Sequence, residues 1–142
     1  MRPDGSQLQE YARGLHQPRG GIAFDELGNA FHLDDDLAGG GKFEGVRLLH
    51  VLEGGDYGWR ERAGGKPDLA RAAAWGERPG ALPGILKTGS GSPSGLLIIS
   101  GTQFPEFLRG VLVYPDPDRK LVRGYIVERS GQTFKVAAQF DL

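Results

Sequence analysis

Three short apolar runs, separated by residues that favour turns, dominate the first half of the sequence. They occupy residues 22–24, 30–33 and 46–52, and the tetrapeptide 26–29 between the first two contains Gly28 and Asn29. Glycine and asparagine accept the positive φ of a tight turn at low cost. We therefore predict a β-hairpin followed by a third antiparallel strand, so that residues 20–59 form one meander.

The second half of the sequence repeats this rhythm more completely. Strands are predicted at residues 94–101 (buried), 111–114, 120–128 and 133–141, with connections of a few residues each. Such short connections favour antiparallel pairing between neighbours. An edge strand at 7–13 and a short strand at 84–87 complete the pattern. Residues 60–82 have no clear period and are expected to form a surface insertion with a short helical stretch.

Short antiparallel sheets that follow one another along the chain are the blades of a β-propeller. The predicted fold class is all-β, a partial propeller of about two to two and a half four-stranded blades with a loop and short-helix insertion. We expect a single incomplete domain, 1–142, in which an edge strand and first blade (7–59), an insertion (60–82) and a second blade (83–142) follow in order. An open arc leaves strand edges exposed, so we expect self-association or flanking sequence.

Composition supports many turns and excludes several functions. The chain has 142 residues, of which 24 are glycine, more than twice the usual share of about 7%. The net charge of −1 gives no electrostatic attraction to nucleic acid or anionic membranes. There is no cysteine, no apolar run approaches the ~20 residues of a membrane span, and the first residues lack the apolar segment of a signal peptide.

The run Asp34-Asp35-Asp36 is the strongest candidate for a binding site. Adjacent carboxylates repel one another, and a nearby cation would relieve the repulsion. Alternation along a strand sends Asp34 and Asp36 to one face and Asp35 to the other. The alternative is a solvated turn before a glycine-rich loop, and the sequence alone leaves both open.

Other candidate motifs fit structural roles. His16, His32 and His50 lack the spacing of a metal triad, so we expect structural or exposed histidines. Tyr57 and Trp59 are expected to cap the hydrophobic core. The glycine run 39–41 is no phosphate-binding loop, because no Ser or Thr follows Lys42 and no helix pattern comes next.

Several segments together resemble a known family. These are residues 14–25, the segment 29–36 and the Glu-Gly-Gly-Asp-Tyr-Gly-Trp block at 53–59. They are similar to the soluble quinoprotein sugar dehydrogenases, six-bladed propellers of the glucose/sorbosone dehydrogenase type, and to related bacterial propellers labelled membrane-bound dehydrogenases. The similarity continues through residues 93–96, 104–105 and 109–110 to the end of the chain. It implies binding of pyrroloquinoline quinone (PQQ) above a Ca²⁺ ion, and oxidation of a sugar or alcohol in a periplasmic or secreted protein.

The resemblance also assigns residues. The family's cofactor loop corresponds to residues 17–20, which makes Gln17 and Arg19 cofactor-binding candidates together with Asp35. Its metal loop corresponds to residues 34–37, where Asp36 and Leu37 inherit backbone carbonyl contacts to Ca²⁺ and Asp34 joins them as a metal candidate. A basic cofactor ligand of the family falls near residues 116–119, where Lys120 is close to the matched position but not at it.

No catalytic residue is assigned, because the family's catalytic histidine belongs to an earlier blade that these residues do not contain. The haem-binding Cys-x-x-Cys-His of some relatives is also missing. The first hypothesis is a fragment of a quinoprotein-type sugar or alcohol dehydrogenase that contributes cofactor- and calcium-facing loops. The alternative is a non-catalytic, propeller-like binding or scaffold module for carbohydrate or protein, which the changed side chains at Gln17 and Arg19 favour.

Overall fold

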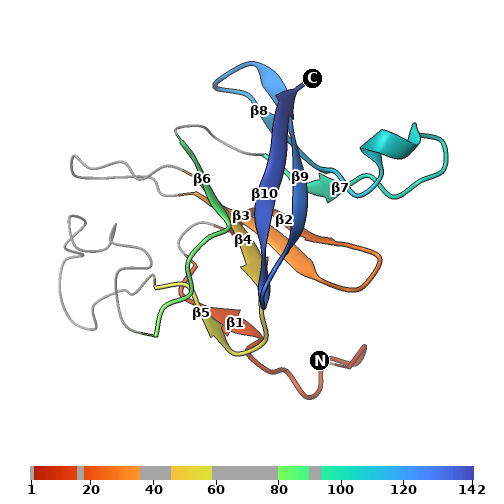
Figure 1. Cartoon of the computed structure of the whole chain (residues 1–142). Helices are drawn as coiled ribbons and strands as arrows, with labels where there is room; N and C mark the ends of the chain where they lie inside the picture. Colours follow the sequence, from red (N-terminus) through yellow and green to blue (C-terminus); the bar gives the residue numbers. More distant parts are fainter. Residues whose placement is uncertain (1, 16–17, 36–45, 59–79, 90–93) are drawn as a thin grey trace.

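In the part of the chain that the structure describes, nearly all the regular structure is β-strand (Figure 1). The computed structural model describes residues 2–15, 18–35, 46–58, 80–89 and 94–142. Within these residues, the strands in chain order are β1 (Ala12–Arg13), β2 (Pro18–Phe24), β3 (Ala30–Asp35), β4 (Val46–Val51), β5 (Gly55–Asp56), β6 (Leu86–Gly89), β7 (Leu97–Ile98), β8 (Leu112–Asp116), β9 (Leu121–Ser130) and β10 (Thr133–Asp141), and a short 3-10 helix, η1 (Glu106–Leu108), precedes β8.

The first sheet has four antiparallel strands in the order β2-β3-β4-β6. The β2–β3 turn is closed by Asp25, whose carboxylate accepts hydrogen bonds from the backbone N–H of Leu27 and Asn29. This is the turn that the sequence predicts. Strand β4 is buried along its whole length because both faces are covered. The short strands β1 and β5 form a separate parallel pair.

The second sheet is also antiparallel and four-stranded, with the order β7-β8-β9-β10. Strands β9 and β10 form a long hairpin whose register shifts once, between Val136 and Ala138. Leu112, Tyr114 and Tyr125 point from this sheet toward the first one.

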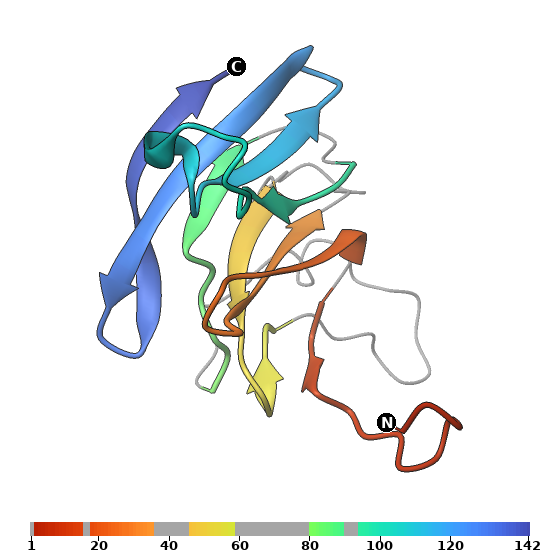
Figure 2. The ribbon, with the colours of Figure 1, turned by 90° about the vertical axis from the view of Figure 1, so that its right-hand side faces the viewer.

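The two sheets lie side by side and share a hydrophobic core (Figures 1 and 2). Phe31, Leu33 and Leu48 of the first sheet pack with Leu112 and Tyr114 of the second. Burial of this many large apolar side chains is the main favourable contribution to the association of the sheets.

At one end of the interface, an aromatic contact joins the sheets. The rings of His50 on β4 and Phe134 on β10 meet edge to face, 4.9 Å apart, and His50 Nδ1 lies 3.3 Å from Thr133 Oγ1. Arg129 stacks over Phe134. Burial, assisted by the charge of Arg129, lowers the pKa of His50.

The predicted strands are largely confirmed, with differences in length and partners. The strand predicted at 94–101 is only Leu97–Ile98, and Leu97 is half exposed rather than buried. The strand predicted at 84–87 forms at Leu86–Gly89 and pairs with β4, so it belongs to the first sheet. Of the strand predicted at 7–13, only Ala12–Arg13 forms.

The segment predicted as an insertion, 60–82, falls mostly outside the described residues. Its last residue, Leu82, packs against the cluster of Ala30, Leu49, Val51 and Tyr57, so it is partly buried and contributes to the core. Within the described residues, no helix has the length and apolarity needed to cross a membrane.

Candidate functional site

The predicted cofactor and metal segments flank the same end of the first sheet. Strands β2 and β3 run antiparallel, and Pro18 at the start of β2 lies opposite Asp34 near the end of β3. Asp35 in turn lies opposite Val46, the first residue of β4. We call this end, which carries Pro18, Asp35, Val46 and Thr88, the loop end.

Strand β2 is distorted at the loop end. Between the pairs Pro18–Asp34 and Ile22–His32, the three residues 19–21 of β2 lie opposite one residue of β3. Gly20 and Gly21 both have φ of +79°, a conformation that favours glycine. The bulge brings Gly20 against the segment before β7, where the N–H of Leu96 donates to the Gly20 carbonyl at 3.4 Å.

Asp34, the first residue of the acidic run, has a buried arginine as its partner. Arg47 Nη2 donates to Asp34 Oδ2 at 2.9 Å, and the two side chains are 2% and 0% exposed. Arg47 Nη1 also donates to the backbone carbonyl of Tyr57 at 3.1 Å. The carboxylate of Asp34 is therefore part of an internal ion pair that ties β3, β4 and the segment after β5 together.

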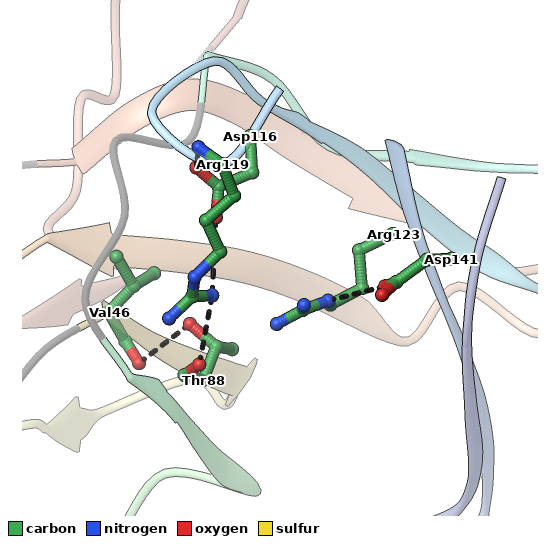
Figure 3. A network of polar contacts seen from close by, with 6 residues as sticks. All are labelled: Val46, Thr88, Asp116, Arg119, Arg123 and Asp141. Carbon is green, nitrogen blue, oxygen red and sulfur yellow. Dashed lines mark hydrogen bonds and ion pairs between the residues drawn. The ribbon is translucent and has the colours of Figure 1, made fainter. Parts of the chain in front are cut away.

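A second polar network crosses between the sheets at the loop end (Figure 3). Arg119 Nη1 donates to Asp116 Oδ2, at 3.3 Å, and to the backbone carbonyl of Thr88, at 3.2 Å. Thr88 Oγ1 donates to the carbonyl of Val46. Arg119 thus connects the β8–β9 turn to β6 and β4. Lys120, next to it, has a left-handed φ of +56°.

Arg123 and Asp141 form a further pair on β9 and β10, with Arg123 Nε 2.9 Å from Asp141 Oδ1 (Figure 3). This carboxylate raises the pKa of Arg123 further above its already high value. Tyr114 and Tyr125 stack nearby with centroids 5.9 Å apart, and burial raises the pKa of Tyr125.

The remaining candidates from the sequence fall in different places. Arg19 lies within β2 and Asp35 ends β3, at the loop end. Three other candidates, Gln17, Asp36 and Leu37, lie outside the described residues, as do His16 and Trp59.

The histidines and Tyr57 have clear surroundings. His32 and His50 are buried, and His32 Nδ1 lies 2.8 Å from the carbonyl of Gly21. Tyr57 is fully buried and caps a core cluster, as predicted, while its hydroxyl donates to the carbonyl of His50 and accepts from the N–H of Leu52. In the described part of the chain, no three acidic or histidine side chains gather closely enough to hold a metal ion.

Sequence reasoning missed the two arginines that organise the loop end. Arg47 is the only charged residue in the apolar stretch Val46–Val51. A charge within a buried strand needs a partner, so its position in this stretch is the signal that could have identified it. Arg119 lies in the segment 116–119 near which the resemblance places a basic cofactor ligand, but its contacts with Asp116 and Thr88 gave no signal, since an arginine in a turn is usually solvated.

Neither known protein families nor curated proteins give a match to this sequence. Several solved structures, however, match this chain. A Thermus thermophilus oxidoreductase described as a glucose dehydrogenase matches with a TM-score of 0.68 and 17% identity, over 92% of this chain and 34% of that one. A further structure titled glucose dehydrogenase matches with a TM-score of 0.69 and 22% identity, over 97% and 38%. The PQQ-bound form of an aldose sugar dehydrogenase from Streptomyces coelicolor matches with a TM-score of 0.59 and 18% identity, over 93% and 32%.

The chain has the fold of part of a sugar dehydrogenase propeller. It spans about a third to two-fifths of the length of these structures. The resemblance expected from the sequence is confirmed in its fold, an all-β partial propeller.

Proposed function

We propose that this chain is an arc of a quinoprotein-type sugar or alcohol dehydrogenase propeller and contributes cofactor- and calcium-facing loops at its loop end. The observation that carries the proposal is the pairing of Pro18 with Asp34. It brings together, at the loop end, the backbone of the two segments that the resemblance assigns to the cofactor and the metal. The fold shared with sugar dehydrogenases supports the same reading.

The residues of the loop end suit this role in a specific way. The bulge at Gly20 and Gly21 interrupts the β2–β3 ladder, so backbone groups there can serve a ligand. The ion pair with Arg47 engages Asp34, so its part is to fix the end of β3, while Asp36 and Leu37 would offer oxygens to Ca²⁺. Gln17, Arg19 and Asp35 would hydrogen-bond the polar rim of PQQ. The bound quinone would supply hydride acceptance, with Ca²⁺ polarising it.

Removal of the substrate's hydroxyl proton needs a general base. The resemblance places that base on another blade, so these 142 residues are expected to bind without turning over substrate. The intact relative would oxidise a small sugar or alcohol in the periplasm or outside the cell.

Binding of PQQ to the purified chain tests the proposal. Isothermal titration calorimetry with Ca²⁺ should give saturable binding, weakened at least tenfold when Ca²⁺ is replaced by EDTA. Arg19→Ala should weaken it by about tenfold, the effect of losing one charge-assisted hydrogen bond. Lys135→Ala, an exposed change on the β9–β10 hairpin, is the matched control and should bind like the original chain. Absence of binding at millimolar PQQ would exclude the proposal.

One observation favours a second candidate, a non-catalytic scaffold. Asp34 and Arg119, charged residues at the loop end, are engaged by Arg47, Asp116 and the Thr88 carbonyl. Charged side chains that pair internally hold the framework together, and a stable framework is what a binding or scaffold module for carbohydrate or protein needs. The same titration separates the two functions, because a scaffold leaves PQQ unbound while the chain stays folded.

We further propose that the chain self-associates. Strands β2, β6, β7 and β10 end the two four-stranded sheets, and such edges carry backbone groups that pair readily with another strand. Light scattering should therefore give a mass above the 15.3 kDa of one chain, rising with protein concentration. A monodisperse monomer over the whole range would contradict this.

A further inference from the structure

His32 is a buried histidine that the proposed cofactor chemistry does not use. It sits in the middle of β3, opposite Ile22 on β2 and Leu49 on β4. Its neighbours Phe31 and Leu33 point into the core between the sheets, so His32 points to the face of the first sheet away from the second. Only 2% of the residue is exposed.

The hydrogen bond of His32 fixes its tautomer. Its Nδ1 lies 2.8 Å from the carbonyl oxygen of Gly21, and a carbonyl oxygen can only accept. The proton of the neutral ring is therefore assigned to Nδ1, and Nε2 carries a lone pair. The ring is held as an acceptor whose orientation is set by the glycine bulge of β2.

Among the described residues, Nε2 has no hydrogen-bond partner although it is buried. Native proteins satisfy nearly all such atoms, because an unpaired buried acceptor has lost its hydration without replacement. We therefore expect a hydrogen-bond donor from outside the described residues to pair with His32 Nε2.

A small notch lies at the same place. Leu15, Gly21, Ile22, His32 and Val51 line it, and its volume is about 130 Å³. An apolar cavity of about 150 Å³ holds one benzene ring. Ile22 is 50% exposed, so one wall can move aside without disturbing the core.

The composition of the walls narrows the choice of occupant. A buried water needs two to four polar partners. Here Leu15, Ile22 and Val51 supply apolar walls, and of the two lone pairs of the Gly21 carbonyl one already accepts from His32. A molecule with one donor and an apolar body satisfies Nε2 and the walls together, which a lone water does not.

We propose that this notch binds a small neutral hydroxyl compound, of the size of phenol, whose O–H donates to His32 Nε2. The site stands on the geometry of β2 and β3 and is independent of PQQ or Ca²⁺ binding. If the PQQ titration fails, the proposal for the notch is therefore unaffected. If the notch binds no phenol, the proposed cofactor function is likewise unaffected.

Phenol, anisole and toluene test the proposal on the unaltered chain. The three molecules have similar apolar bodies, but only phenol carries a hydroxyl donor. Amide NMR titrations should shift the signals of Gly21, Ile22 and Val51, and phenol should bind roughly tenfold more tightly than anisole, the effect of one hydrogen bond. The ¹⁵N shift of His32 Nε2 should respond to phenol and not to toluene. Equal affinities for phenol and anisole, or shifts confined to other residues, would overturn the proposal.

Two variants sharpen the test. His32→Leu replaces the imidazole with an apolar side chain of similar size, so it should remove the roughly tenfold preference for phenol while toluene binds as before. Ile22→Trp enlarges a half-exposed wall of the notch and should abolish binding of all three compounds. Undiminished binding of phenol to folded Ile22→Trp would show that the compound binds elsewhere.

Discussion

Replacing Asp34 with alanine is expected to lower the free energy of unfolding by about 3–5 kcal/mol, the cost of removing one partner of a buried ion pair. Its partner Arg47 is 2% exposed in its side chain, and the 2.9 Å contact supplies the carboxylate that neutralises it. Without Asp34, the guanidinium keeps its bond to the Tyr57 carbonyl but loses this carboxylate. Urea unfolding followed by circular dichroism measures the loss.

Two controls separate burial from the mere presence of an ion pair. Glu128 lies 2.8 Å from Lys135, as close as Asp34 is to Arg47, but both side chains are more than half exposed. Glu128→Ala should therefore leave stability unchanged within error. The double variant Asp34→Leu with Arg47→Met removes both charges and should recover much of the loss. If Asp34→Ala and Glu128→Ala behaved alike, the structural role of the buried pair would be refuted.

Calcium dependence decides between a framework role and a metal role for Asp34. An internal ion pair stabilises the protein equally in EDTA and in Ca²⁺, whereas a metal ligand stabilises only the calcium-loaded form. We expect the same loss in both buffers. A loss that appears only with Ca²⁺ would return Asp34 to the metal site that the acidic run suggested.

The strands could be predicted from the sequence because alternation and turn residues are local signals. The β2–β3 hairpin and β10 follow directly from them, and β10 was predicted at its observed limits. The partner of β6 could not be predicted, because residues 86–89 pair with β4, across a long stretch of chain. Periodicity predicts that a strand forms, but it does not predict which sheet the strand joins.

The candidate site shows the same limit. The acidic run and the segment at 17–20 could be singled out by residue type and resemblance. That Asp34 is engaged by Arg47 depends on the register of β3 against β4, which brings the two residues opposite each other. The unpartnered Nε2 of His32 depends equally on its position opposite Ile22 and beside Gly21, so residue type alone gave no signal.

Replacing Gly20 with alanine is expected to cost about 2–5 kcal/mol, the sum of a left-handed conformation and overpacking. Its φ is +79°, and a Cβ there would lie 2.4 Å from the Cα and 2.6 Å from the N of Gly95. Both atoms belong to the backbone, so β2 and the segment before β7 would have to separate. The two sheets would lose a direct contact, including the bond between Leu96 N–H and the Gly20 carbonyl.

Two neighbouring glycines provide matched controls for this prediction. Gly21 has the same φ of +79° but open space around its position, so Gly21→Ala should cost only the conformational part, about 1–2 kcal/mol. Gly95 takes part in the same close contact, yet a Cβ on Gly95 would point into open space, so Gly95→Ala should be nearly neutral. Thermal and urea unfolding of the three variants should rank the loss as Gly20, then Gly21, then Gly95. Equal losses at Gly20 and Gly21 would mean that backbone conformation alone sets the cost. The close approach of the sheets at the loop end would then contribute nothing to stability.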